Sequence, residues 1–161
     1  MVFEWYNAGQ HRLRIWSAAS STGEEPYTIA MTVLDVLGTT NVDFKILATD
    51  ISTRVLSAAE KGIYTQEKVE ALPRSVLARF FEREDTSPPT YRVSQEVKQH
   101  VVFRRLNLSR PPFPMRGPLD IVFCRNVLIY FDQPVRQRLL SAIEGLLRPG
   151  GWLFLGHTET L

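Results

Sequence analysis

The amino-acid sequence predicts an α/β fold built around a parallel sheet. Short apolar runs alternate with segments of helical periodicity, first near the N-terminus and again after a different middle region. The chain has 161 residues, of which 44% are hydrophobic and 22% charged. This composition is typical of a soluble globular protein and suits one domain over residues 1–161.

Two strand–helix units are predicted in the first part of the chain. Each strand is a short buried run, and each helix has an N-terminal signal, Pro26 or Ser52, and a glycine at its end. The predicted elements are, in order, residues 14–19, 26–37, 44–49 and 52–61.

The middle of the chain is predicted to be a small β-subdomain inserted on the main sheet, about residues 82–107. Residues 66–81 have the pattern of one or two helices interrupted at Pro73. Residues 82–90 are polar and are expected to form a loop. Two short strands, expected to pair as a hairpin, follow at residues 91–93 and 100–106.

Regular α/β architecture returns after a proline-rich connection over residues 109–118. An apolar strand is predicted at residues 119–124, and Asp132 is the predicted N-cap of a helix that ends at residues 149–151. The inner stripe of this helix is expected to be Val135, Leu139, Ile143, Leu146 and Leu147. Another buried strand is predicted at residues 152–155.

Small residues follow the first predicted strand, where backbone approaches ligands in open α/β sheets. A dinucleotide site would need a G-x-G-x-x-G turn there, but Gly23 is the one glycine of this segment. Glu24 and Glu25 would repel a pyrophosphate and would suit a cationic ligand such as S-adenosylmethionine, which carries a sulfonium and an ammonium group. Alternatively, these carboxylates only complement the helix dipole.

Asp50 closes the second predicted strand. An acidic side chain at this position can accept hydrogen bonds from both ribose hydroxyls of an adenosine ligand. The alternative is that Asp50 is a helix cap or a turn residue, which is common for aspartate. Its place after the Gly23 turn favours the adenosine ligand.

The segment from Cys124 to Phe131 directly follows a predicted strand, at the same edge of the sheet. Arg125 and Asn126 are polar residues at the strand exit, and Tyr130 and Phe131 are placed to form a wall of a cofactor site. Alternatively, the two aromatic side chains belong to the core and Arg125 is a surface charge.

Four segments together resemble the chemotaxis receptor methyltransferase (CheR) family and occur in that family's order. They are residues 16–27, 48–52, 123–131 and 154–159, and the similarity runs from about Leu13 to the end. The resemblance implies a Rossmann-like class I methyltransferase sheet that binds S-adenosylmethionine. It also implies an O-methyltransferase that forms glutamate methyl esters on the cytoplasmic domain of methyl-accepting chemotaxis receptors.

The resemblance also implies roles for individual residues. Glu25 would face the amino-acid end of the cofactor and Asp50 its ribose, while Asn107 and Leu108 would border the adenine. Tyr130 near the methyl group and Arg125 on the cofactor side are the candidate catalytic residues. The expected cofactor-binding set is Ala18, Gly23, Glu25, Asp50, Ile51, Asn107, Leu108, Arg125, Asn126 and Tyr130.

Two parts of the family pattern are missing, so the sequence resembles a domain truncated at both ends. Family members have a helical domain in front, with a Thr-x-Phe-Phe-Arg segment that reaches the cofactor, and further strands behind. Because alignment and water exclusion would depend on that cover, we expect weak cofactor binding and slow turnover. An unpaired edge at residues 152–155 would also favour self-association.

Composition and residue spacing also bear on the compartment and on membrane, metal and nucleic-acid binding. The single cysteine, Cys124, fits a reducing cytoplasm, and no apolar run reaches the length of about 20 residues that a membrane span needs. The three histidines have no metal-ligand spacing, so no metal is expected. A net charge of +2 does not indicate nucleic acid.

Residues 97–119 hold five basic side chains and no acid. This stretch is either a solvated face or a docking surface for an acidic protein, with nucleic acid third. Two rival functions stay open: an NAD-dependent oxidoreductase, and a non-catalytic cofactor- or receptor-binding module derived from this family.

Overall fold

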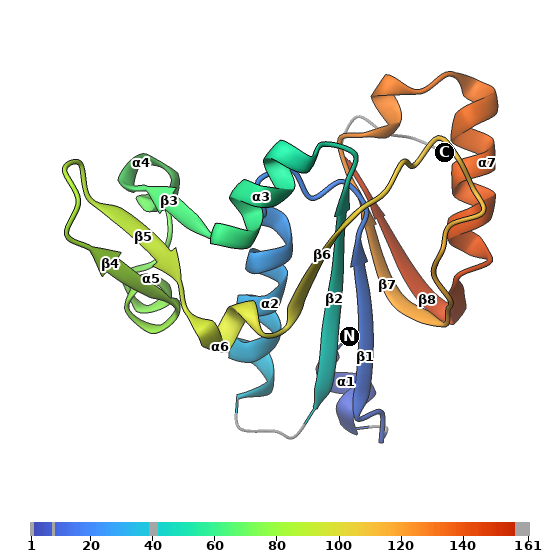
Figure 1. Ribbon diagram of the computed structural model, residues 1–161. Helices are drawn as coiled ribbons and strands as arrows, with labels where there is room; N and C mark the ends of the chain where they lie inside the picture. The colour runs from blue at the N-terminus through green and yellow to red at the C-terminus, as the bar shows by residue number, and fades with distance from the viewer. Residues whose placement is uncertain (1, 8, 39–41, 157–161) are drawn as a thin grey trace.

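The centre of the protein is a five-stranded sheet in which all neighbouring strands are parallel (Figure 1). The computed structural model describes residues 2–7, 9–38 and 42–156. The order in the sheet is β6-β2-β1-β7-β8, from β1 (Arg12–Ser17), β2 (Asp43–Asp50), β6 (Val101–Arg105), β7 (Leu119–Cys124) and β8 (Leu147–Leu155). The parallel α/β sheet that the sequence predicts is therefore confirmed.

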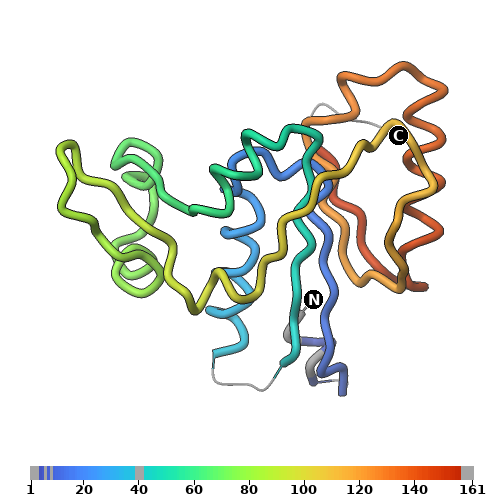
Figure 2. Tube along the Cα trace, viewed as in Figure 1, coloured from blue at the N-terminus to red at the C-terminus, as the bar shows by residue number. Residues whose placement is uncertain are grey.

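Helices cover both faces of this sheet, which explains the short apolar runs in its inner strands, residues 46–48 of β2 and 121–124 of β7. Alternate strand residues point to opposite faces. Ile15 and Ile121 pack with α2 (Glu24–Leu37) and α3 (Thr53–Lys61), whereas Trp16 and Val122 pack with α7 (Gln133–Glu144). The connection over residues 106–118 lies on the α7 side (Figure 2), where Phe113 contacts the Trp16 ring edge-on at 5.4 Å between centroids.

Local signals define most helix ends. The Asp132 carboxylate accepts a hydrogen bond from the Val135 amide at 3.0 Å, as the predicted N-cap requires. Ser52 caps α3, and Gly62 ends it in the left-handed conformation. A short α1 (Val2–Asn7) precedes β1.

The end of the chain differs from the prediction. Helix α7 stops at Glu144, and Pro149 and Gly150 belong to β8, where the pairing with β7 shifts register between Leu119 and Ile121. A bulge of this kind accommodates proline inside a strand. Residues 152–155 are not buried as predicted: Trp152 is 49% exposed, because β8 is the edge strand among the residues that the structure describes.

A second, three-stranded antiparallel sheet lies to one side of α2 and α3 (Figures 1 and 2). Its order is β3-β5-β4, from β3 (Ile63–Thr65), β4 (Phe81–Glu84) and β5 (Thr90–Val93). Two short helices pack against it, α4 (Gln66–Val69) and α5 (Arg74–Phe80), whereas α6 (Gln95–Lys98) leads from β5 to β6 and contacts α2.

The predicted hairpin of residues 91–93 and 100–106 is wrong. Strand β5 pairs with β3 and β4, whereas β6 pairs in parallel with β2 in the central sheet. The small sheet thus lies within residues 63–93 rather than 82–107, and part of the predicted loop 82–90 is strand. β4 lacks the apolar pattern of a strand because three of its four side chains are charged. β3 has three residues, too few to show the alternation of a strand, so neither strand is predicted from the sequence.

Candidate cofactor site

A cavity of about 260 Å³ lies at the carboxyl edge of the central sheet. The segments that follow β1, β2, β6 and β7 all contribute to it, as expected for a ligand site in an open α/β sheet. Its lining residues are Ala18, Ala19, Asp50, Ile51, Leu106, Asn107, Leu108, Val127, Tyr130 and Phe131.

The Asp50 carboxylate is held by two backbone amides. One oxygen accepts a hydrogen bond from Ser52 N at 2.9 Å, and the other accepts one from Ser21 N at 3.0 Å. Asp50 is therefore the turn residue that the alternative interpretation expected, and it also lines the cavity. Because a carboxylate has about four lone-pair sites, it can still accept two hydroxyl donors from a ligand.

The turn between β1 and α2 packs too closely for any residue but glycine at position 23. Gly23 has φ 95°, and a Cβ there would lie 3.0 Å from both the Ala59 Cβ and the Tyr64 hydroxyl. Its amide donates to the Ser20 carbonyl at 2.9 Å, which closes the turn. Gly23 thus shapes the turn and lies outside the cavity lining, and its contact with the cofactor stays a prediction.

A buried pair of hydrogen bonds joins the ends of β1 and β2. The Trp16 indole donates to the Thr49 hydroxyl at 2.9 Å, and this hydroxyl donates to the Ala18 carbonyl at 2.8 Å. The Thr49 carbonyl also accepts the Ser20 amide at 2.9 Å. Thr49 therefore fixes the backbone of one cavity residue and precedes another, Asp50.

The rest of the cavity is mostly apolar. Ile51, Leu106, Leu108, Val127 and Phe131 supply its walls, which suits a flat ring such as a purine. Tyr130 is 78% exposed and lies at the solvent side of the lining. The Asn107 side chain accepts hydrogen bonds from the Ser109 amide and hydroxyl, so its carbonyl oxygen organises the turn after β6.

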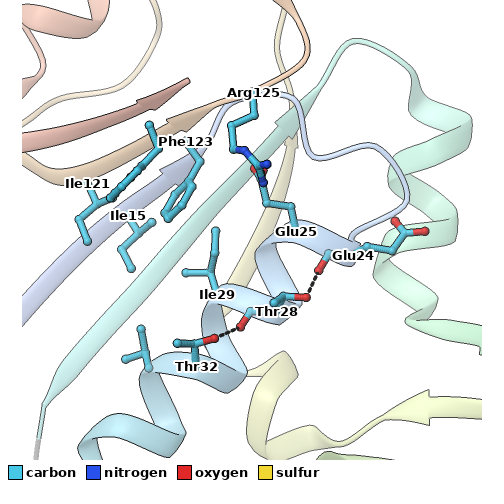
Figure 3. Close-up of a pocket in the computed structure, with 11 residues that line it drawn as sticks. Ile15, Glu24, Glu25, Thr28, Ile29, Thr32, Ile121, Phe123 and Arg125 are labelled. Carbon is cyan, nitrogen blue, oxygen red and sulfur yellow. Dashed lines mark hydrogen bonds and ion pairs between the residues drawn. The ribbon is translucent and has the colours of Figure 1, made fainter. Parts of the chain in front are cut away.

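Glu25 and Arg125 lie in a separate groove of about 580 Å³ between α2 and the strands β1, β7 and β8 (Figure 3). Glu25 accepts a hydrogen bond from the Ser17 hydroxyl at 2.8 Å, and its other oxygen lies 3.5 Å from an Arg125 guanidinium nitrogen. The groove floor is apolar, with the rings of Phe123 and Phe154 stacked 4.8 Å apart.

The structure thus places most of the predicted site residues in two spaces, the cavity and the groove. The cavity brings together Ala18, Asp50, Ile51, Asn107, Leu108 and Tyr130. Glu25 and Arg125 meet in the groove, and Gly23 and Asn126 line neither space. Asn126 has φ 56°, a left-handed conformation that turns the chain after β7.

Three of the lining residues are not predicted from the sequence: Ala19, Leu106 and Val127. Their side chains carry no chemistry that would single them out. The available signal was position, because each lies within a few residues of the end of a parallel strand. Thr49, by contrast, was missed because its hydroxyl acts inside the protein rather than in the cavity.

The residues present fit an adenosine cofactor that carries a positive charge. Asp50 offers a carboxylate for ribose hydroxyls, the apolar walls suit adenine, and Glu25 offers a second carboxylate for a cation. The turn lacks the glycines that seat a pyrophosphate. A parallel sheet with these carboxylates and apolar walls at its carboxyl edge places the chain in the class of S-adenosylmethionine-dependent methyltransferase domains.

Comparison with known proteins identifies the family within this class. Residues 3–161 match the family described as "CheR methyltransferase, SAM binding domain", and the chain belongs to it. The chain is 49% identical over 153 residues to chemotaxis protein methyltransferase 2 of Pseudomonas aeruginosa, covering 93% of this chain and 54% of that protein. It is 49% identical over 148 residues to chemotaxis protein methyltransferase of Escherichia coli K12, covering 91% and 51%.

The chain therefore spans about half the length of these relatives. A solved structure, the DhpI complex with S-adenosylhomocysteine, aligns with a TM-score of 0.56 at 15% identity, covering 98% of this chain and 55% of that one. This likeness concerns the fold, which is that of class I methyltransferases. Within the described residues, no helix is both long and apolar enough to span a membrane.

Proposed function

We propose that the protein is an S-adenosylmethionine-dependent O-methyltransferase that forms glutamate methyl esters on the cytoplasmic domain of chemotaxis receptors. The observation that carries the proposal is the Asp50 cavity at the carboxyl edge of the sheet, in a chain of the CheR methyltransferase family. The relatives are named chemotaxis protein methyltransferases, which supports the same activity and points to receptors as partners. Since the proposed substrate is cytoplasmic, we place the protein in the cytoplasm.

Each group of residues would hold one part of the cofactor. Asp50 would accept the ribose hydroxyls, and the apolar side chains around Leu108 would enclose the adenine. Glu25 and Arg125 would hold the ammonium and carboxylate of the amino-acid end, and their mutual ion pair in the free protein supports this pairing of charges. The bound cofactor supplies a methyl group on a positively charged sulfur.

The proposed reaction needs little acid or base catalysis from the protein. A glutamate side chain has a pKa of about 4.3, so it is already an anionic nucleophile at pH 7 and needs no general base. The residues of the cavity would mainly align the acceptor oxygen and keep water out. Tyr130, exposed at the solvent side of the cavity, is the side chain best placed to orient the methyl group or to contact the cation through its ring.

The product tests the proposal. We expect the chain, incubated with methyl-labelled S-adenosylmethionine and a receptor cytoplasmic domain, to transfer label that mild base releases as methanol. A methyl ester hydrolyses under these conditions, whereas a methyl group on nitrogen does not. A receptor domain with its acceptor glutamates changed to glutamine is the matched control and should take up no label. Base-stable label would exclude the ester chemistry, and cofactor binding without any transfer would favour the non-catalytic module.

A further inference from the structure

Two side chains from the small-sheet region reach the turn between β1 and α2. The hydroxyl of Tyr64, on β3, donates a hydrogen bond to the Thr22 carbonyl at 2.8 Å. Lys68, on α4, forms an ion pair with Glu24 and lies 3.5 Å from the Thr22 hydroxyl. The small sheet is therefore in direct contact with the turn that lies beside the cofactor cavity.

The Tyr64 contact is buried and tightly packed. Tyr64 is 7% exposed, and its ring meets Tyr27 edge-on at 6.4 Å between centroids. Tyr27 is itself anchored, because its hydroxyl donates to the Ala59 carbonyl at 2.8 Å. Burial raises the pKa of Tyr64, so its hydroxyl stays protonated and remains a donor at physiological pH. Gly23 leaves no space between the turn and this ring.

The same turn holds the Asp50 carboxylate. The Ser21 amide, one residue before Thr22, donates to Asp50, and the Ser20 amide donates to the Thr49 carbonyl. A continuous path of hydrogen bonds and peptide links thus runs from Tyr64 through Thr22 and Ser21 to Asp50. A shift of the turn away from Tyr64 would move one of the two amides that orient this carboxylate.

We propose that the small sheet is energetically coupled to the cofactor site, with Tyr64 as the positioning residue that holds the turn of residues 20–23 against Asp50. The proposal rests on the cofactor cavity of the proposed function. Coupling is reciprocal, so cofactor binding would stabilise the docking of the small sheet as much as the small sheet stabilises the cofactor site. A partner bound to the small sheet would then alter cofactor affinity.

Tyr64→Phe in the whole chain tests the coupling, because it removes one hydroxyl and keeps the ring. We expect amide hydrogen exchange of residues 20–24 to rise in the absence of ligand, and S-adenosylhomocysteine to bind about 3- to 10-fold more weakly. The matched control is Tyr91→Phe: Tyr91 pairs with Tyr64 across the small sheet, and no hydrogen bond joins its hydroxyl to the described part of the chain. The control should match wild type in both measurements.

A second measurement needs no variant. In the wild-type chain, S-adenosylhomocysteine should slow amide exchange in residues 90–93, which lie in the small sheet away from the cavity. Unchanged turn exchange in Tyr64→Phe, or weaker binding that Tyr91→Phe reproduces, would overturn the coupling and leave a purely structural role. If the wild-type chain does not bind S-adenosylhomocysteine, the proposed function fails, and turn exchange in Tyr64→Phe still decides whether Tyr64 holds the turn.

Discussion

Replacing Asp50 with alanine is expected to weaken S-adenosylhomocysteine binding by about 1.5–3 kcal/mol, or roughly 10- to 150-fold, the range for hydrogen bonds to a charged group. The carboxylate lines the cavity and is pre-oriented by the amides of Ser21 and Ser52, so a ligand need not order it. The variant also leaves these two amides without their acceptor and loosens the turn. Calorimetric titration of the folded variant measures the loss.

The matched control is Asp43→Ala, at the other end of the same strand. Asp43 forms an ion pair with Arg14 near the surface, far along β2 from the cavity. Its removal should change the dissociation constant less than about twofold, because exposed ion pairs contribute little. An Asp50→Ala variant that folds and binds like the control would refute the ribose assignment.

Local signals in the sequence predicted those parts of the fold that depend on local chemistry. The N-caps Ser52 and Asp132 and the glycine ends of α2 and α3 are set by one or two residues each, and the structure confirms them. Strand β7 is an apolar run between a proline-rich connection and a polar segment, and its predicted bounds agree with the structure. Local signals at Glu24, Glu25 and Asp50 indicated a cationic adenosine ligand but left alternatives open, and the family resemblance added the cofactor itself.

Pairing between distant strands could not be predicted in the same way. Residues 91–93 and 100–106 are both short and partly apolar, and nothing in either segment states which neighbour it joins. The structure assigns the first to the small sheet and the second to β2 because β6 buries Val101 and Phe103 against the α2 side of the central sheet. The order of strands is a property of the whole chain.

The site residues show the same difference between features set by local residues and features set by distant contacts. Asp50 and Tyr130 are predicted because acidic and aromatic residues after a strand suggest ligand binding, and Ile51 is predicted through the family resemblance. All three line the cavity. Glu25 is predicted in the same site, and the structure places its side chain in the groove, paired with Arg125. The direction of a side chain on the first turn of a helix depends on such partners, which the sequence separates by many residues.

Thr49→Val is expected to lower the free energy of unfolding by about 2–4 kcal/mol, since an unsatisfied buried polar group costs about 1–3 kcal/mol. The valine keeps the shape of threonine but can neither accept from the Trp16 indole nor donate to the Ala18 carbonyl. Both groups are buried, so water cannot replace the lost partner. Because Ala18 lines the cavity, cofactor binding should weaken as well. Urea denaturation followed by tryptophan fluorescence measures the stability.

Two further variants separate the hydroxyl from the general effect of a substitution. Thr49→Ser keeps both hydrogen bonds and should recover most of the lost stability and cofactor affinity. Thr32→Val removes an exposed hydroxyl on the groove side of α2, away from Thr49, that bonds only within its own helix, to the Thr28 carbonyl. Its cost should stay within about 0.5 kcal/mol, as for most surface substitutions. If Thr49→Val is as stable as Thr49→Ser, the bonds between Trp16, Thr49 and Ala18 do not hold the cavity edge together.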